Sequence, residues 1–483
     1  MKLNQLTLVE ATIGLRKKKF SSQELVKACL GRIKKIDGKI KSFITVCEKE
    51  AIRQAGETDD LIGKDANIFA KKSLLGIPVA VKDLFCTKGL RTTAASNVLK
   101  SYFPPYESTV TKRLLDAGAI ILGKTNLDAW AHGSSTERSD FFTTHNPWDL
   151  TRIPGGSSGG SAASVVSDET ITSIGTETGG SIRIPASMCG IVGLKPSYGR
   201  VSRFGVIAMA SSLDCPGPLT KTVEDAALLL KIIAGKDRFD ATTSSLTVED
   251  YFSSLNNFNI KKLKIGVPKE YFIKKIEKEV LRQVWTAIRI LKKKGAQIKE
   301  VSLMDPKYSV AVYTIIQRSE VSSNLARYDG VRFGNGRDCF GEEAKRRIML
   351  GTYALSDMLK EVLNLNEPPY IQAQRVRTLI VEDFNKIFKE IDVLLAPTSP
   401  SVAIKIGQSE ENPMFGELTD LLVLGSTIAG LPGINVCCGF SQGLPIGMQL
   451  IGRQFSESLL LQTADYYQKN TDWHVRRPLV GSK

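Results

Sequence analysis

Short apolar runs alternate with amphipathic helical segments along much of the chain, and this alternation restricts the possible folds more than any other sequence feature. The helical segments carry apolar residues every three or four positions, whereas the runs between them have the length of buried strands. This pattern is typical of an α/β sheet that helices cover on both faces. The predicted helices are 109–116, 160–166, 222–234 and 280–291, and the predicted strands are 74–81, 118–122, 171–175, 264–267, 297–301 and 392–396.

The first sixty residues read differently, as helix throughout. Ser21 and Glu24 have the spacing of a capping box, and apolar residues follow at helical intervals. We predict that residues 1–60 form a helical segment packed on the core, and that residues 61–483 form a single globular unit. The polar stretch 237–259 is predicted to be a surface loop.

Composition favours a cytoplasmic protein without a metal site. The eight cysteines include no CxxC pair, which argues against zinc and for reduced thiols. The N-terminus lacks the apolar core of a signal peptide, and no run of about 18 apolar residues could span a membrane. The net charge of +15 comes mostly from scattered lysine clusters, which favours a solvated surface over a dedicated RNA-binding groove.

Two segments rich in glycine and serine are the best candidates for chemistry. They lie at residues 154–161 and 175–181, and each joins apolar elements. Glycine allows other groups to approach the backbone closely, so a serine in such a segment can lie beside exposed N–H groups. A nucleophile next to preorganised donors is what stabilisation of an oxyanion requires.

Three schemes could activate a nucleophile or bind a substrate here. Residues 155–159 match the GxSxG pattern of a Ser-His-Asp triad with His474 downstream, but no strand precedes them. Residues 118–125 match the P-loop pattern GxxxxGK[ST], but their apolar interior reads as the strand itself. The third scheme uses Lys82, which ends an apolar run; burial would lower its pKa and allow it to act as a base. Taken alone, this segment would be explained better by an ion pair between Lys82 and Asp83 at the end of a strand.

Lys82, the 155–161 segment and the 178–183 segment together resemble the amidase signature family over residues 5 to 475. The resemblance implies a large mixed central sheet covered by helices on both faces. It also implies that Ser181 is the nucleophile, Ser157 the bridging serine and Lys82 the base, with a cis peptide between Gly156 and Ser157. The backbone N–H groups that would hold the oxyanion belong to Thr178, Gly179, Gly180 and Ser181.

Within this family, the segments 133–137, 146–149, 322–332, 345–352 and 429–433 are similar to the A subunits of tRNA-dependent amidotransferases. The resemblance implies a glutaminase that passes ammonia to a B subunit, with a small C subunit in the complex. Tyr313, Arg347 and Asp420 would bind the amino-acid end of glutamine, since a guanidinium suits a carboxylate and a carboxylate suits an ammonium group. The chain itself would need no cofactor. ATP and Mg²⁺ would act at the partner, which would also bind most of the mischarged tRNA, either Glu-tRNA(Gln) or Asp-tRNA(Asn).

Four positions depart from the pattern of these A subunits: Glu177 replaces Asp, Ile184 replaces Gln, His132 replaces Met, and Ala129 replaces an acidic residue. None of them belongs to the Ser-Ser-Lys set. Two other functions stay open, a stand-alone amidase of small or aryl amides and a non-catalytic scaffold or RNA-binding protein. The opposite charges of Arg347 and Asp420 favour glutamine over an aryl amide, and the complete Ser-Ser-Lys set favours an enzyme.

Overall fold

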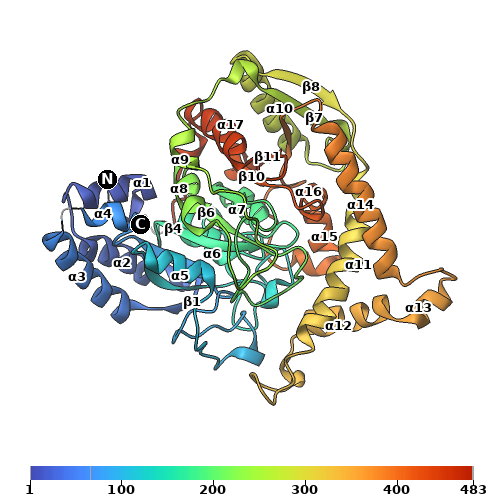
Figure 1. The fold of residues 1–483 in the computed structure, drawn as a ribbon, viewed down its shortest axis with the longest axis horizontal. Coiled ribbons are helices and arrows are strands. Elements are labelled where there is room, and N and C mark those ends of the chain that lie inside the picture. The colour runs from blue at the N-terminus through green and yellow to red at the C-terminus, as the bar shows by residue number, and fades with distance from the viewer. Residues whose placement is uncertain (1, 66, 481–483) are drawn as a thin grey trace.

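Within residues 2–65 and 67–480, which the computed structural model describes, eleven strands form one mixed sheet (Figure 1). Three neighbours pair in parallel in the first half of the sheet, where β2 lies between β3 and β4, and β7 pairs in parallel with β8 and β9 near the other edge. The remaining pairs are antiparallel. In spatial order the strands are β1 (Phe43–Val46), β3 (Ile120–Thr125), β2 (Pro78–Lys82), β4 (Thr172–Glu177), β6 (Cys215–Thr220), β5 (Val192–Lys195), β10 (Gly433–Ser441), β11 (Leu444–Gly452), β9 (Val393–Pro397), β7 (Lys264–Pro268) and β8 (Gln297–Val301).

Helices cover both faces of this sheet, as the alternation in the sequence predicts. Every residue of β2, β4 and β9 is buried. Because neighbouring residues of a strand point to opposite faces, uninterrupted burial requires a cover on each side. The helices that pack directly on strands include α6 (Gly159–Val166), α7 (Arg183–Cys189), α8 (Val223–Ile233), α10 (Lys278–Lys293) and α17 (Glu457–Lys469).

The N-terminal helices gather at one side of the molecule, coloured blue in Figure 1. The capping box predicted from the sequence is present. Ser21 accepts a hydrogen bond from the backbone N–H of Glu24, whose side chain accepts one from the backbone N–H of Ser21. Such a cap contributes about 1 kcal/mol to helix stability. These helices are α1 (Leu8–Arg16), α2 (Ser22–Ile40), α3 (Glu48–Lys64) and α4 (Ile68–Lys71).

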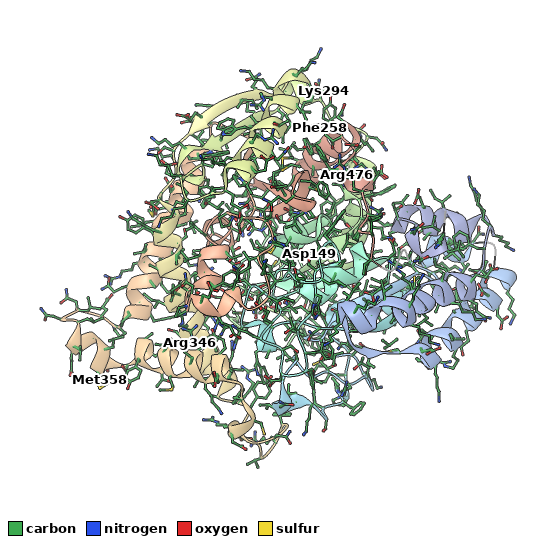
Figure 2. All side chains as sticks on the ribbon, turned by 180° about the vertical axis from the view of Figure 1, so that it is seen from behind. Asp149, Phe258, Lys294, Arg346, Met358 and Arg476 are labelled. Atoms are coloured by element: carbon green, nitrogen blue, oxygen red, sulfur yellow. The ribbon has the colours of Figure 1, made fainter. Side chains whose placement is uncertain are left out.

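A helical layer lies at the opposite side, and part of it projects from the body (Figure 1). Figure 2 shows Met358 at the outer end of this projection and Arg346 closer to the body. Helix α11 packs against α12, α14 and α16, so the layer is tied to the body through α11. The helices here are α11 (Pro306–Leu325), α12 (Glu342–Leu355), α13 (Asp357–Val362), α14 (Pro369–Ile387), α15 (Phe415–Thr419) and α16 (Leu424–Ile428); elsewhere lie α5 (Thr109–Asp116) and α9 (Tyr251–Ser254).

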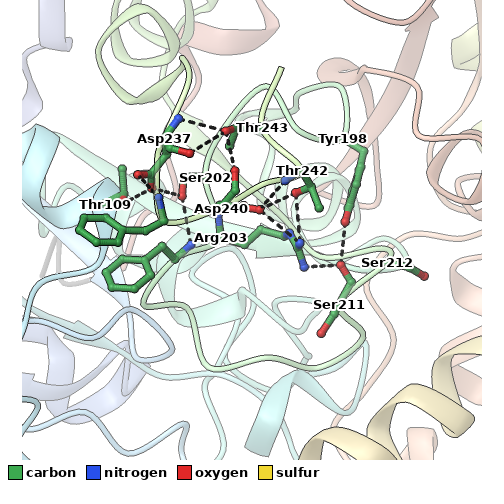
Figure 3. Close-up of polar contacts among 12 residues, drawn as sticks. Thr109, Tyr198, Ser202, Arg203, Ser211, Ser212, Asp237, Asp240, Thr242 and Thr243 are labelled. Atoms are coloured by element: carbon green, nitrogen blue, oxygen red, sulfur yellow. Dashed lines mark hydrogen bonds and ion pairs between the residues drawn. The ribbon is translucent and has the colours of Figure 1, made fainter. Parts of the chain in front are cut away.

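Most of the segment 237–259 is exposed or half-buried, as predicted for a surface loop, but it is anchored at its start. Its first part is folded back on the body, because Asp237 and Asp240 are buried and accept hydrogen bonds from groups on other segments (Figure 3). Thr109 and Ser202 donate to Asp237, and the backbone N–H of Arg203 donates to Asp240. These hydrogen bonds fix the first part of the segment, while most of the remaining polar residues face solvent or are half-buried.

No helix in the described part of the chain is long and apolar enough to cross a bilayer. The eight cysteines, all of which lie within the described residues, are free thiols. Across residues 2–65 and 67–480, no group of three or more His, Cys, Asp or Glu side chains is placed to hold a metal ion.

Candidate active site

The sheet brings the ends of three strands to one edge. Strands β2 and β4 are parallel, with Val81 opposite Ile174, so Lys82 at the end of β2 lies beside the end of β4. Strand β6 runs the other way, with its first residue Cys215 opposite Glu177. The loop after β4 and the segment before β6 therefore meet next to Lys82. This meeting point is the candidate active site.

Lys82 is fully buried and reaches into both glycine- and serine-rich segments. Its Nζ lies 2.7 Å from Ser157 Oγ, 2.9 Å from Ser158 Oγ and 3.0 Å from Thr176 Oγ1. These three partners are uncharged hydroxyl groups, and Nζ also donates to the uncharged carbonyl of Thr176 at 3.4 Å. None of these hydrogen-bond partners carries a negative charge that would strongly favour the ammonium form. Lys82 can therefore be populated as a neutral amine.

Burial lowers the pKa of Lys82 from 10.5 to about 7, and the charges of Asp128, Asp214 and Glu177 oppose a larger decrease. Desolvation disfavours the charged ammonium, whereas nearby carboxylates favour it. A base with a pKa near the working pH is both largely neutral and still able to hold a proton. The environment of Lys82 thus suits a general base.

Asp83 does not pair with Lys82. Its carboxylate lies 3.4 Å from Lys124 Nζ, with both side chains buried, and it accepts a hydrogen bond from the backbone N–H of Thr93 at 2.9 Å. Lys124 lies within β3, so the segment that matches a P-loop pattern is a strand. The Ser-His-Asp scheme also finds no support, because in residues 2–65 and 67–480 no histidine hydrogen-bonds to Ser157.

The loop between β4 and α7 is held in a tight turn by Glu177. Its carboxylate accepts hydrogen bonds from the backbone N–H groups of Ile182 at 3.1 Å and Arg183 at 3.0 Å, and forms a buried ion pair with the Arg183 guanidinium at 2.6 Å. The backbone N–H of Ser158 donates to the carbonyl of Ser181 at 3.2 Å. This bond joins the two serine-rich segments directly, and only 4% of Ser181 is exposed.

The first serine-rich segment contains the cis peptide implied by the family resemblance, between Gly156 and Ser157. Thr136 braces the segment on both sides of this bond. Its hydroxyl donates to the Gly155 carbonyl at 2.9 Å and accepts from the Gly159 N–H at 3.1 Å. Thr136 connects this segment to the 133–137 loop.

Gly179 and Gly180 lie against side chains that leave no room for a Cβ atom. A Cβ on Gly179 would lie 2.7 Å from Asp420 Oδ2 and 2.9 Å from Tyr313 Oη. A Cβ on Gly180 would lie 2.7 Å from Asp420 Oδ1. Glycine is required here because the Asp420 carboxylate and the Tyr313 hydroxyl approach the backbone closely.

Tyr313, Arg347 and Asp420 come together although they lie on three different elements. The charges of both Arg347 and Asp420 act on the pKa of the Tyr313 hydroxyl, which burial raises. Arg347 is 5% exposed, and its Nε donates to Glu343 at 2.6 Å. Burial and the charge of Glu177 raise the pKa of Asp420 well above its ordinary value, while a hydrogen bond from Ser134 at 3.1 Å opposes the increase. Arg347 and Asp420 thus place a cation and a carboxyl group near the 178–181 loop, and Glu343 and Glu417 add negative charge beside Arg347.

Several residues at this site were not singled out from the sequence. Ser158 and Thr176 share Lys82 with Ser157, and Ser134 contacts Asp420. Ser158 and Thr176 lie inside the two serine-rich segments, so their position in the sequence could have predicted a role at the site. No spacing in the sequence indicated that Ser134 would contact Asp420. Among the departures, Ile184 packs in an apolar cluster, and His132 is buried beside Arg347 and Glu343.

Comparison with known proteins agrees with this geometry. The family model described as Amidase matches residues 24–461. The A subunit of the glutamyl-tRNA(Gln) amidotransferase of Thermodesulfovibrio yellowstonii is 48% identical over 99% of this chain and 100% of the relative. Its counterpart in Carboxydothermus hydrogenoformans is also 48% identical, over 99% of this chain and all of its own length.

Among solved structures, the A subunit of the glutamyl-tRNA(Gln) amidotransferase from Thermotoga maritima superposes with a TM-score of 0.83 at 40% identity, over 100% of this chain and 99% of that one. The native peptide amidase from Stenotrophomonas maltophilia gives a TM-score of 0.80 at 26% identity, over 98% of each chain.

Proposed function

This chain belongs to the amidase family, and from that membership we propose that it is the glutaminase subunit of a tRNA-dependent amidotransferase. It would hydrolyse glutamine to glutamate and ammonia. The observation that carries the proposal is the 2.7 Å contact between Lys82 Nζ, whose pKa is lowered to about 7, and Ser157 Oγ. The names of the relatives, together with the charges of Arg347 and Asp420, support glutamine as the substrate.

In the proposed mechanism, neutral Lys82 accepts a proton from Ser157 while Ser157 accepts one from Ser181. The Ser181 Oγ attacks the carbon of the side-chain amide, and the carbonyl oxygen becomes an oxyanion. The backbone N–H groups of residues 178–181 would hold this oxyanion. The C–N bond then breaks, the nitrogen takes the proton back through Ser157, and ammonia leaves. Water attacks the glutamyl ester by the same proton route and releases glutamate.

The side chains of Tyr313, Arg347 and Asp420 beside the 178–181 loop would bind the other end of glutamine. Arg347 would bind the α-carboxylate, Asp420 the α-ammonium group, and the Tyr313 hydroxyl would hydrogen-bond to the bound amino acid. Burial and the charge of Glu177 raise the pKa of Asp420, and an ammonium group bound beside it would favour the ionised carboxylate. Binding of the amino acid would therefore complete a charge pair at Asp420.

The ammonia would be used by a partner. By analogy with the relatives, we propose a B subunit that uses ATP and Mg²⁺ to convert Glu-tRNA(Gln), or Asp-tRNA(Asn), to the amidated product, and a small C subunit. The tRNA would contact mainly the B subunit. The chain would work in the cytoplasm, and its own catalytic set needs no cofactor.

The test is ammonia release from glutamine by the full chain, alone and with proteins that co-purify from its native cell. Ser181→Ala should abolish turnover. Ser164→Ala is the matched control, because Ser164 is also buried but its hydroxyl donates to the Ser161 carbonyl within α6. Turnover that survives in Ser181→Ala would remove this serine from the mechanism. Full activity on aryl amides without glutamine hydrolysis would instead support a stand-alone amidase.

A further inference from the structure

Asp214 lies immediately before β6 and contacts the loop that follows β4. Because Cys215 pairs with Glu177 across the two antiparallel strands, the residue before Cys215 lies next to the residue after Glu177, which is Thr178. The Thr178 Oγ1 donates to Asp214 Oδ1 at 2.6 Å. A hydrogen bond from a hydroxyl to a carboxylate is among the stronger kinds in proteins.

The Asp214 carboxylate also organises its own turn. Oδ2 accepts from the backbone N–H of Met209 at 2.9 Å, and Oδ1 accepts from that of Ala210 at 3.2 Å. Asp214 is only 5% exposed. The carboxylate therefore has fixed donors on one side and Thr178 on the other, so the turn and the 178–181 loop are connected through a single side chain.

Neighbouring segments fix the turn in place. Glu320 on α11 accepts from the backbone N–H of Ser212 at 2.9 Å, and Arg377 on α14 donates to the Ser212 carbonyl at 3.2 Å. Figure 3 shows Tyr198 and Arg203 bonded to Ser211 on the same turn. A turn held from this many directions is a rigid support for Asp214.

We propose that Asp214 is a positioning residue, which holds the Thr178 side chain and thereby fixes the backbone N–H groups of residues 178–181 for oxyanion stabilisation. This rests on the proposed amide hydrolysis. Glu177 anchors the far end of the loop by binding the N–H groups of Ile182 and Arg183. Asp214 would anchor the near end. Donors held in place before the reaction stabilise a transition state far better than mobile ones.

The test compares Asp214→Asn, Thr178→Val and the double variant in the full chain. Asparagine replaces one carboxylate oxygen of Asp214 by an NH₂ group, which cannot accept a hydrogen bond from the N–H donors. Valine keeps the shape of Thr178 but removes the hydroxyl that donates to Asp214. Rates are measured at about pH 8.5, where Lys82 is mostly neutral, so the effect of the Asp214 charge on Lys82 is small. We expect kcat for glutamine to fall about 10- to 100-fold in each single variant, no further in the double variant, and KM to change less than about threefold. Thr178→Ser should restore most of the activity.

Asp225→Asn is the matched control. Asp225 is a buried carboxylate that also accepts from a backbone N–H, that of Val9 at 3.0 Å, but it lies on α8 away from the site. It should lose stability without loss of kcat in the folded enzyme. Equal losses of kcat in Asp214→Asn and Asp225→Asn, or a normal kcat in Thr178→Val, would overturn the proposal. If Asp214→Asn does not fold, the proposal is tested by comparing kcat of Thr178→Val, which should fall, with kcat of Thr178→Ser, which should stay near the wild-type value.

A second measurement separates this inference from the proposed substrate. A fluorophosphonate probe forms an Oγ–P bond with the nucleophilic serine and releases fluoride, and its phosphoryl oxygen needs the same N–H groups. The rate at which Ser181 is labelled, followed by intact mass, should fall in Thr178→Val and recover in Thr178→Ser. Wild-type labelling without glutamine hydrolysis would refute the proposed function and leave this comparison valid. A wild-type chain that shows neither would refute both.

Discussion

Lowering the pH from 8 to 6 should reduce kcat/KM for glutamine about tenfold. Lys82 has a pKa of about 7, so by the titration of a single group about 90% of it is neutral at pH 8 and about 10% at pH 6. Only the neutral amine has a lone pair that can take the proton of Ser157. Activity must therefore be lost as the pH falls through the pKa of Lys82.

The measurement is the initial rate of ammonia release at low glutamine concentration between about pH 5.5 and 8, at constant ionic strength. Under these conditions kcat/KM reports the pKa values of the free enzyme. The carboxyl group of glutamine titrates well below this range and its ammonium group mainly above pH 8, so a drop in rate between pH 7 and 6 reports the enzyme. Circular dichroism at each pH controls for unfolding.

A perturbation of the same group sharpens the test. The charge of Asp214 raises the pKa of Lys82, so Asp214→Asn should move the midpoint of the profile to lower pH even though the variant is slower. A flat profile for the wild-type chain, or a rate that still rises about tenfold per pH unit at pH 8, would refute a buried lysine with a pKa of about 7 as the base.

Three further outcomes follow from the same contacts. As the pH is raised from 7 to 9, the unfolding free energy of the wild type should increase by about 2 kcal/mol more than that of Lys82→Met, as measured by urea unfolding. The pKa of Lys82 is about 7 in the folded chain and 10.5 in the unfolded chain, so the unfolded chain binds more protons in this range. Gly179→Ala should raise KM for glutamine at least about tenfold, since its Cβ would lie 2.7 Å from Asp420 Oδ2; an unchanged KM would contradict the proposed binding of glutamine at Asp420. Glu177→Gln should cost about 3–5 kcal/mol in thermal unfolding, because it leaves the Arg183 charge buried without its partner.

Local sequence patterns were enough to predict the α/β fold class and the two serine-rich segments. The capping box at Ser21, the strand at 297–301 and the helix beginning after Thr222 were all readable, because caps and periodicity involve residues close together in the chain. The two serine-rich segments stood out for the same reason. Recognition of Lys82 as part of the same site came only with the family resemblance, since a strand-end lysine is ordinary by itself.

Spacing along the chain could not identify which charges would meet. Asp83 is adjacent to Lys82 in sequence but pairs with Lys124, because Lys82 ends β2 whereas Asp83 lies in the turn that follows it, beside β3. The polar stretch 237–259 was predicted as a surface loop, and most of it is exposed or half-buried, yet Asp237 and Asp240 are buried against Ser202 and Arg203. In both cases the partner lies on another segment.

The amino-acid order alone dictates that this chain forms strands and helices in alternation, and that two turns present serine hydroxyls beside bare backbone. The ability of Lys82 to act as a base depends on the tertiary structure. Parallel pairing of β2 with β4 brings the amine to the serine hydroxyls, and antiparallel pairing of β6 brings Asp214 to Thr178. A pKa depends on the solvent excluded and the charges nearby, and both are set only when distant segments pack together.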